Sequence, residues 1–333
     1  MPRIIQFILL STVSLTVVAE EQITQSQVVT PLPEIIYTEP APSFPEFADN
    51  IWGDLGVFVK RIDPAENYEF LVGLTVGTLI LIKYDQDILD TSQHFARRLG
   101  LISDTKTGSE GHVIFDLSFG GFDIPVRVPK NSNAAMYFIG DGLTHIVIAG
   151  SLATYGMAND DFRATNTANQ IMESILVSGT IVQILKRATG RQSPFQSTED
   201  GGNWDFFPSF SDYSSNVSNY DAFPSGHIAT AMATTTVLAY NYPEHTYIKP
   251  LGYTLMGILG WGRLNNGVHW ASDYPAGIAI GWLAADIAYE RGKKRRRIHD
   301  HESTTQKSGF QLNAIIPYTF SNDGFGMLFN FSF

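Results

Sequence analysis

The chain has 333 residues, of which 44% are hydrophobic and 17% charged, enough for the core of one large domain or two small ones. Its net charge of −11 makes nucleic acid an unsuitable partner for the surface as a whole, although a small anion in a local basic pocket is compatible with it. It contains no cysteine, which excludes disulfides, thiolate catalysis and cysteine-ligated metals.

The N-terminal segment has the pattern of a secretory signal peptide. Arg3 precedes an apolar stretch from Ile4 to Ala19, and two glutamates follow. We expect cleavage after Ala19, with an uncleaved anchor helix as the alternative. Either reading predicts export, to the periplasm or cell envelope, with membrane association left open. Residues 20–50 are polar and proline-rich, which predicts an extended tether.

The fold class predicted for residues 65–299 is a mainly α helical bundle. After an apolar run over residues 70–82, helical patterns cover about 134–157, 168–186, 227–242, 251–262 and 276–289. Their apolar runs are mostly interrupted or shorter than a bilayer requires, and the mean hydropathy is −0.02. These patterns favour a bundle that is either soluble or membrane-associated.

Two β-hairpins are predicted beside the bundle. Alternating residues near 112–128 flank Gly120 and Gly121, which are typical of a hairpin turn. Residues 308–333 alternate in the same way around an Asn-Asp-Gly turn, so we expect a C-terminal hairpin there.

The sequence Pro-Ser-Gly-His at residues 224–227 stands directly before a helix rich in small and apolar residues. Asp221, Pro224 and Ser225 are compatible with simple helix-start signals. The same turn is also suited to aiming backbone N–H groups and an imidazole at an anion. These four residues alone do not decide between the two interpretations.

A second group of polar residues follows in the segment 261–277. Arg263 precedes His269 by six positions, and Asp273 follows that histidine by four. On one helical turn His269 and Asp273 share a face, so the carboxylate can accept from one ring nitrogen and leave the other free to act as nucleophile or base. Upstream, Lys186 and Arg191 lie at the end of an apolar helix, where cations also favour the helix dipole.

In this order the three groups resemble the type 2 phosphatidic acid phosphatase family, which shares its fold and pocket with bacterial class A acid phosphatases and vanadium haloperoxidases. The motifs cover residues 186–273, and the helical resemblance extends over about 65–295. Gly190 and Arg191 match a Gly-Arg found in many members. Two positions depart from the pattern, since Ser193 stands where the family has arginine and Gly262 where it has serine.

The resemblance implies a metal-independent phosphatase without a cofactor, acting on a phosphomonoester or diphosphate of a lipid or isoprenoid. His269 would attack phosphorus and carry the phosphoryl group, Asp273 would orient it, and His227 would protonate the leaving group. The side chains and N–H groups expected to hold the phosphoryl oxygens belong to Lys186, Arg191, Arg263, Ser225 and Gly226.

Two other functions stay open at this stage. One is vanadate-dependent halide oxidation in the same cationic pocket, and the other is a catalytically degenerate phosphoanion-binding envelope protein, motivated by Ser193 and Gly262. Asp141 and His145 form a further i,i+4 pair, which we interpret as a helix contact rather than a metal site. Four aromatic residues of one loop are candidates for the entrance of an acyl or prenyl chain: Trp204, Phe206, Phe207 and Phe210.

Overall fold

The computed structural model describes residues 35–37, 47–101, 111–119, 122–129, 131–293, 296–298, 311–320 and 324–332. The predicted signal peptide lies outside these residues, as does most of the predicted tether. The described part of the chain is mainly helical, with three two-stranded antiparallel ladders, which confirms the predicted fold class.

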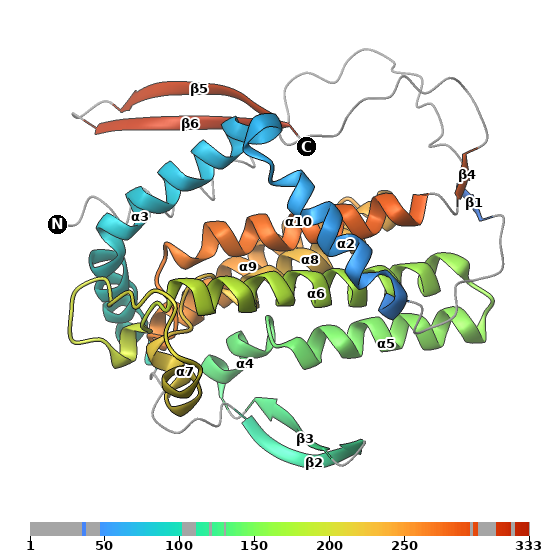
Figure 1. The fold of residues 1–333 in the computed structure, drawn as a ribbon, viewed down its shortest axis with the longest axis horizontal. Coiled ribbons are helices and arrows are strands. Elements are labelled where there is room, and N and C mark those ends of the chain that lie inside the picture. The colour runs from blue at the N-terminus through green and yellow to red at the C-terminus, as the bar shows by residue number, and fades with distance from the viewer. Residues whose placement is uncertain are drawn as a thin grey trace.

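Helix α6 (Phe162–Thr189) is the central element of the bundle. Figure 1 shows it between α5 (Gly142–Ala158) on one side and α10 (Asp273–Lys293) on the other, with α8 (Gly226–Asn241) and α2 (Phe47–Arg61) also packed against it. Its core contacts are aliphatic: Val177 and Val182 cluster with residues of α8 and α10. Burial of these side chains at the centre fixes the end of α6, where the predicted motif begins.

Helix α9 (Ile248–Asn265) closes the bundle next to α8. Leu259 of α9 packs with Ile228 and Met232 of α8, and the short helix α4 (Ser132–Phe138) lies against α9. A long helix, α3 (Pro64–Arg98), also contacts α9 and α10. The segment between α6 and α8 is a loop with two single-turn 3₁₀ helices (Pro194–Gln196 and Val217–Asn219) around α7 (Phe210–Ser215).

Both predicted hairpins are confirmed. Strands β2 (Gly111–Phe119) and β3 (Phe122–Pro129) pair antiparallel, as do β5 (Gln311–Phe320) and β6 (Gly324–Ser332). A third ladder, which the sequence did not predict, joins β1 (Ile35–Tyr37) to β4 (Arg296–Ile298).

Two expected boundaries were wrong. The single helix expected over about 134–157 is divided into α4 and α5, because the glycine-containing segment 139–141 leaves the helical path before Gly142 starts α5. The tether expected to reach residue 50 ends earlier, since α2 begins at Phe47. That start is held by the Phe47 N–H, which donates to Asn169 Oδ1 of α6 at 3.3 Å.

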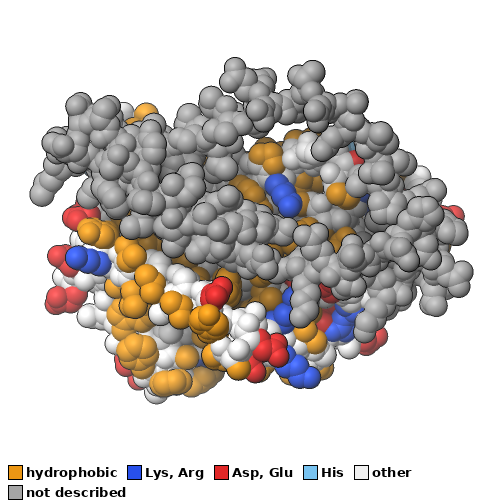
Figure 2. Space-filling model, turned by 90° about the horizontal axis from the view of Figure 1, so that it is seen from above, with side chains coloured by type: hydrophobic (Ala, Val, Ile, Leu, Met, Phe, Trp, Pro, Cys, Tyr) orange, Lys and Arg blue, Asp and Glu red, His pale blue; other side chains and the backbone are white. Residues whose placement is uncertain are grey.

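Helix α3 is an exception to the mostly short or interrupted apolar runs noted in the sequence. It has 35 residues, and by length and composition it is the one helix in the described ranges able to cross a membrane. Only 6% of its most apolar window is buried within the protein. Figure 2 shows apolar side chains gathered in broad stretches on the coloured part of one face of the molecule. Exposed apolar side chains also lie on α5 and α9, including Val147, Tyr155, Leu251 and Tyr253.

Candidate active site

His269 lies in the turn between α9 and α10, and only 1% of its surface is exposed. Its Nδ1 is 2.8 Å from the carbonyl oxygen of Ala222 and 3.3 Å from Asp273 Oδ2. A carbonyl oxygen only accepts, so Nδ1 carries the proton and donates to Ala222. The lone pair is therefore on Nε2, which is the nitrogen available to attack an electrophile.

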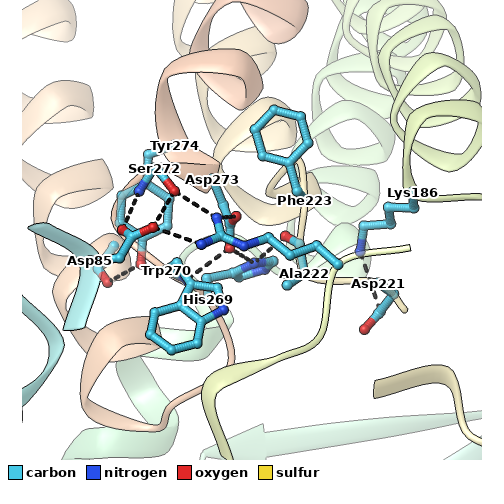
Figure 3. A network of polar contacts seen from close by, with 12 residues as sticks. Asp85, Lys186, Asp221, Ala222, Phe223, His269, Trp270, Ser272, Asp273 and Tyr274 are labelled. Carbon is cyan, nitrogen blue, oxygen red and sulfur yellow. Dashed lines mark hydrogen bonds and ion pairs between the residues drawn. The ribbon is translucent and has the colours of Figure 1, made fainter. Parts of the chain in front are cut away.

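Asp273 is the first residue of α10 and is fully buried. Besides His269, its Oδ2 accepts from the Trp270 N–H at 2.7 Å, and its Oδ1 accepts from Arg191 Nη1 at 2.6 Å. The Trp270 N–H and the Arg191 guanidinium thus hold the carboxylate in place beside the imidazole. This arrangement, drawn in Figure 3, keeps His269 in one orientation.

The guanidinium of Arg191 lies against carboxylates, not in an open pocket as we expected. It is fully buried and donates from Nη1 to Ser272 Oγ and Asp273 Oδ1, both at 2.6 Å. Its Nη2 donates to Asp85 Oδ2 at 2.7 Å and to the carbonyl oxygen of Gly201 at 2.9 Å. Two buried carboxylates stabilise the guanidinium in this position. The rings of Trp204 and Trp270 also lie against it, with their centres 4.6 Å and 5.3 Å from the guanidinium carbon.

Gly190 explains how Arg191 reaches this position. It ends α6 in the left-handed region (φ 53°), and its N–H donates to the Lys186 carbonyl oxygen. A Cβ at this residue would lie 1.8 Å from the carbonyl oxygen of Asp205, so no other residue fits. The turn sends the next residue inward, away from the surface of α6.

Lys186 lies on the last turn of α6 and pairs with Asp221, with 3.3 Å between Nζ and Oδ2. It also lines a cavity of about 740 Å³ together with Arg187, Gly226 and His227. Most of the remaining lining is apolar or glycine (Ile175, Leu176, Gly179, Val182, Ile184, Gly140 and Gly142), and the rest is Thr180, Gln183 and Thr230. The cavity therefore has one cationic end and one apolar flank.

His227 lies in the first turn of α8, with its ring centroid 6.0 Å from that of His269. Burial lowers the pKa of His227 well below its usual range, and the positive charges of Arg263 and Lys186 and the neighbouring His269 act in the same direction. The free site therefore holds a neutral His227 at pH 7, and an anion is needed to favour its protonated form.

Ser225 and Gly226 contribute in different ways. The Ser225 N–H donates to the carbonyl oxygen of Asp273 at 3.0 Å, so it serves the protein rather than an anion. The Ser225 hydroxyl is buried and has no hydrogen-bond partner among the residues that the structure describes. Gly226 begins α8, where N–H groups lack acceptors within the helix.

Arg263 is buried on the last turn of α9, with its guanidinium carbon 4.5 Å from the centre of the Tyr137 ring. The preceding Gly262 departs from the resembled pattern for a packing reason. A Cβ there would lie 2.8 Å from Met136 Cβ of α4, so a serine would displace that helix. The glycine is thus no sign of a degenerate site.

Several residues at the site were not singled out in the sequence. Asp85 and Ser272 complete the Arg191 network, and the Ala222 carbonyl fixes the His269 tautomer. Asp85 lies among Lys83, Gln86, Asp87 and Asp90, so the sequence gives no signal that separates it from its polar neighbours. His145 contacts the carbonyl oxygen of Ile139 through Nε2 at 3.0 Å, away from this network.

Comparison with known proteins matches the region that contains Lys186, His227 and His269. Residues 167–297 match the PAP2 superfamily. Three curated relatives are named lipid A 1-phosphatase. The protein from Rhizobium etli is 29% identical over 54% of this chain and 79% of its own length. The protein from Rhizobium johnstonii is 34% identical over 33% of this chain and 42% of its own length. The protein from Porphyromonas gingivalis is 37% identical over 21% of this chain and 16% of its own length.

Two solved structures align with parts of this chain. Aquifex aeolicus LpxE aligns over 47% of this chain and 83% of its own, with 21% identity and a TM-score of 0.35. A PAP2-type phosphatidylglycerolphosphate phosphatase from Bacillus subtilis aligns over 67% and 96%, with 18% identity and a TM-score of 0.36.

Proposed function

We propose that the protein is a phosphatase that hydrolyses a phosphomonoester of a lipid, because residues 167–297 match the PAP2 superfamily. The observation that carries this proposal is the pair His269 and His227. One imidazole has its Nδ1–H fixed by Ala222 and Asp273, and the other lies beside it at the cationic end of a cavity.

The proposed reaction has two steps. Nε2 of His269 attacks phosphorus, the bond between phosphorus and the ester oxygen breaks, and that oxygen takes a proton from His227. Water then attacks the phosphohistidine, which releases phosphate and restores the imidazole. Asp273 stabilises the positive charge that His269 carries in the intermediate.

Charge on the phosphoryl oxygens would be neutralised by Lys186 and Arg263, with the Ser225 hydroxyl and the Gly226 N–H as further donors. Arg191 is not among them, because its Nη1 and Nη2 atoms already donate to Ser272, to two carboxylates and to a carbonyl oxygen, and the side chain is fully buried. With these groups in place the proposed mechanism uses no metal ion or other cofactor.

A lipid substrate is favoured by the flank of the cavity. The lining residues from Ile175 to Arg187 lie along α6 and are twelve helical steps apart, a length of about 18 Å, which suits an acyl chain. Exposed apolar side chains on α3 are suited to the same bilayer, and we propose that α3 anchors the protein there after export. The relatives named lipid A 1-phosphatase make lipid A the first substrate to test.

The test is phosphate release by the full-length protein in detergent micelles from lipid A, phosphatidate and phosphatidylglycerol phosphate, each with EDTA or with Mg²⁺. Release in EDTA, together with an acid-labile, alkali-stable phosphoryl group on the wild type but not on His269→Gln, is the expected result. Absence of release from every lipid would contradict the phosphatase. Release that depends on Mg²⁺ would contradict the metal-free mechanism alone.

A further inference from the structure

We infer that Arg191 and Asp85 are positioning residues, which set the protonation behaviour of His269 through Asp273 and Ala222 without contacting the substrate. The inference rests on the proposed phosphatase activity. It assigns a part in the reaction to α3, a helix outside the segment that matches the PAP2 superfamily.

Arg191 acts on His269 by two routes. Its side chain donates to Asp273 Oδ1, while the other oxygen of that carboxylate is 3.3 Å from His269 Nδ1. Its backbone carbonyl accepts from the Ala222 N–H at 2.9 Å, and the Ala222 carbonyl accepts from His269 Nδ1. Both groups that hold the imidazole are therefore attached to this one arginine.

Asp85 holds Arg191 from the opposite side. Its Oδ2 accepts from Arg191 Nη2 at 2.7 Å and from the Ser272 hydroxyl at 2.5 Å, and its Oδ1 accepts from the Ser272 N–H at 2.9 Å. Ser272 directly precedes Asp273. Asp85 is fully buried although it lies on the least buried helix of the bundle, and Figure 3 shows it directed at this network.

The charges alternate outward from His269: Asp273 is negative, Arg191 positive and Asp85 negative. Removing Asp85 leaves Arg191 to pair with Asp273 alone and takes a negative charge from the surroundings, so both effects disfavour the imidazolium. Removing Arg191 has the opposite effect. The other titratable or charged groups around His269 stay the same in both variants, namely His227, Tyr274, Arg263, Lys186 and its partner Asp221.

The test is the pH dependence of kcat/KM for Asp85→Asn and Arg191→Gln, read beside the ¹⁵N NMR titration of His269. That titration identifies the limb that reports the nucleophile, because His227 also titrates in the free enzyme. We expect the limb of Asp85→Asn to move to lower pH by about half a unit, and that of Arg191→Gln to higher pH by about one unit. The double variant should lie between them. Asp87→Asn, which removes the same charge from an exposed position two residues along α3, is the control and should leave the limb in place.

If the two residues had only a structural role, the variants would be less stable or slower while the limb of the pH profile stayed in place, and that outcome would overturn the inference. Shifts of the limb in the same direction in both variants would also overturn it. Asp85→Asn is close in shape to wild type, so the test survives if Arg191→Gln does not fold. The same shifts should appear in the ¹⁵N NMR titration of His269, assigned with His269→Gln. That readout needs no turnover, so an inactive wild type would count against the proposed function and leave this inference testable.

Discussion

The carbonyl oxygen of Ala222 lies 0.5 Å closer to His269 Nδ1 than the Asp273 carboxylate does, at 2.8 Å against 3.3 Å. The backbone therefore selects the tautomer with the proton on Nδ1, and the carboxylate mainly supplies charge. In a triad where the carboxylate alone selects the tautomer, the Asp→Asn change costs about 10⁴ in kcat. Here the two roles are separated between two residues.

We accordingly expect Asp273→Asn to lower kcat by about a hundredfold, well short of the loss in His269→Gln, which removes the nucleophile. The measurement is steady-state phosphate release from a lipid phosphate, with melting temperatures to confirm folding. Equal losses in the two variants would show that Ala222 does not fix the tautomer.

The leaving group should determine how much His227 matters. An alkyl phosphate requires protonation of its leaving oxygen, whereas p-nitrophenolate leaves without it. His227→Gln should therefore lose about 10³ in kcat/KM on an alkyl phosphate and less than about tenfold on p-nitrophenyl phosphate. Comparable losses on both substrates would exclude His227 as the general acid.

Acid should destabilise the protein through the same histidine. Burial lowers the pKa of His227 well below 6.5, so below about pH 6.5 the unfolded chain binds more protons than the folded one. Folding stability is therefore complete above that pH and is lost as the pH falls. The melting temperature of His227→Gln should fall less between pH 7.5 and pH 5 than that of wild type, by roughly 2–4 °C. An identical fall in both proteins would contradict the buried neutral state.

Lys186, His227, Arg263, His269 and Asp273 could be proposed from the sequence, because they fall in short motifs with fixed spacing, although His269 lies in the turn before α10 and not on one helical turn with Asp273 as we expected. Asp85 could not, since it meets Arg191 across 106 residues and no local pattern records that contact. The expectation for Arg191 failed for the same reason: from the sequence it is a cation near a pocket, and only packing shows that two buried carboxylates surround it. Ala222 was missed because it acts through its carbonyl oxygen, which every residue has.

Arg187 lines the cavity, held by Gln183 and by contact with the Tyr213 ring. Arg187→Gln should raise KM for a lipid phosphate about fivefold with kcat unchanged, because an exposed cation adds binding common to ground state and transition state. Arg98→Gln, an exposed change at the end of α3, is the matched control. A loss confined to kcat would contradict this role.

The apolar flank of the cavity can be filled at Gly179. A Cβ at this residue of α6 would meet nothing within 4 Å, and the residue lines the cavity. Leucine there should occupy the space proposed for an acyl chain without straining the fold, and it favours the helix by about 1 kcal/mol over glycine. We expect Gly179→Leu to lower kcat/KM at least about tenfold on a long-chain lipid phosphate and less than about twofold on p-nitrophenyl phosphate.

Gly257→Leu on α9 provides the control, since a Cβ there also has open space and Gly257 does not line this cavity. A series of phosphatidates of decreasing chain length should show the defect of Gly179→Leu disappearing as the chain shortens, because a short chain does not reach residue 179. Equal defects on all chain lengths would show that leucine disturbs the catalytic groups themselves. No defect on any lipid would place the acyl chain elsewhere, and the exposed loop aromatics Phe206, Phe207 and Phe210 would then be the next surface to test.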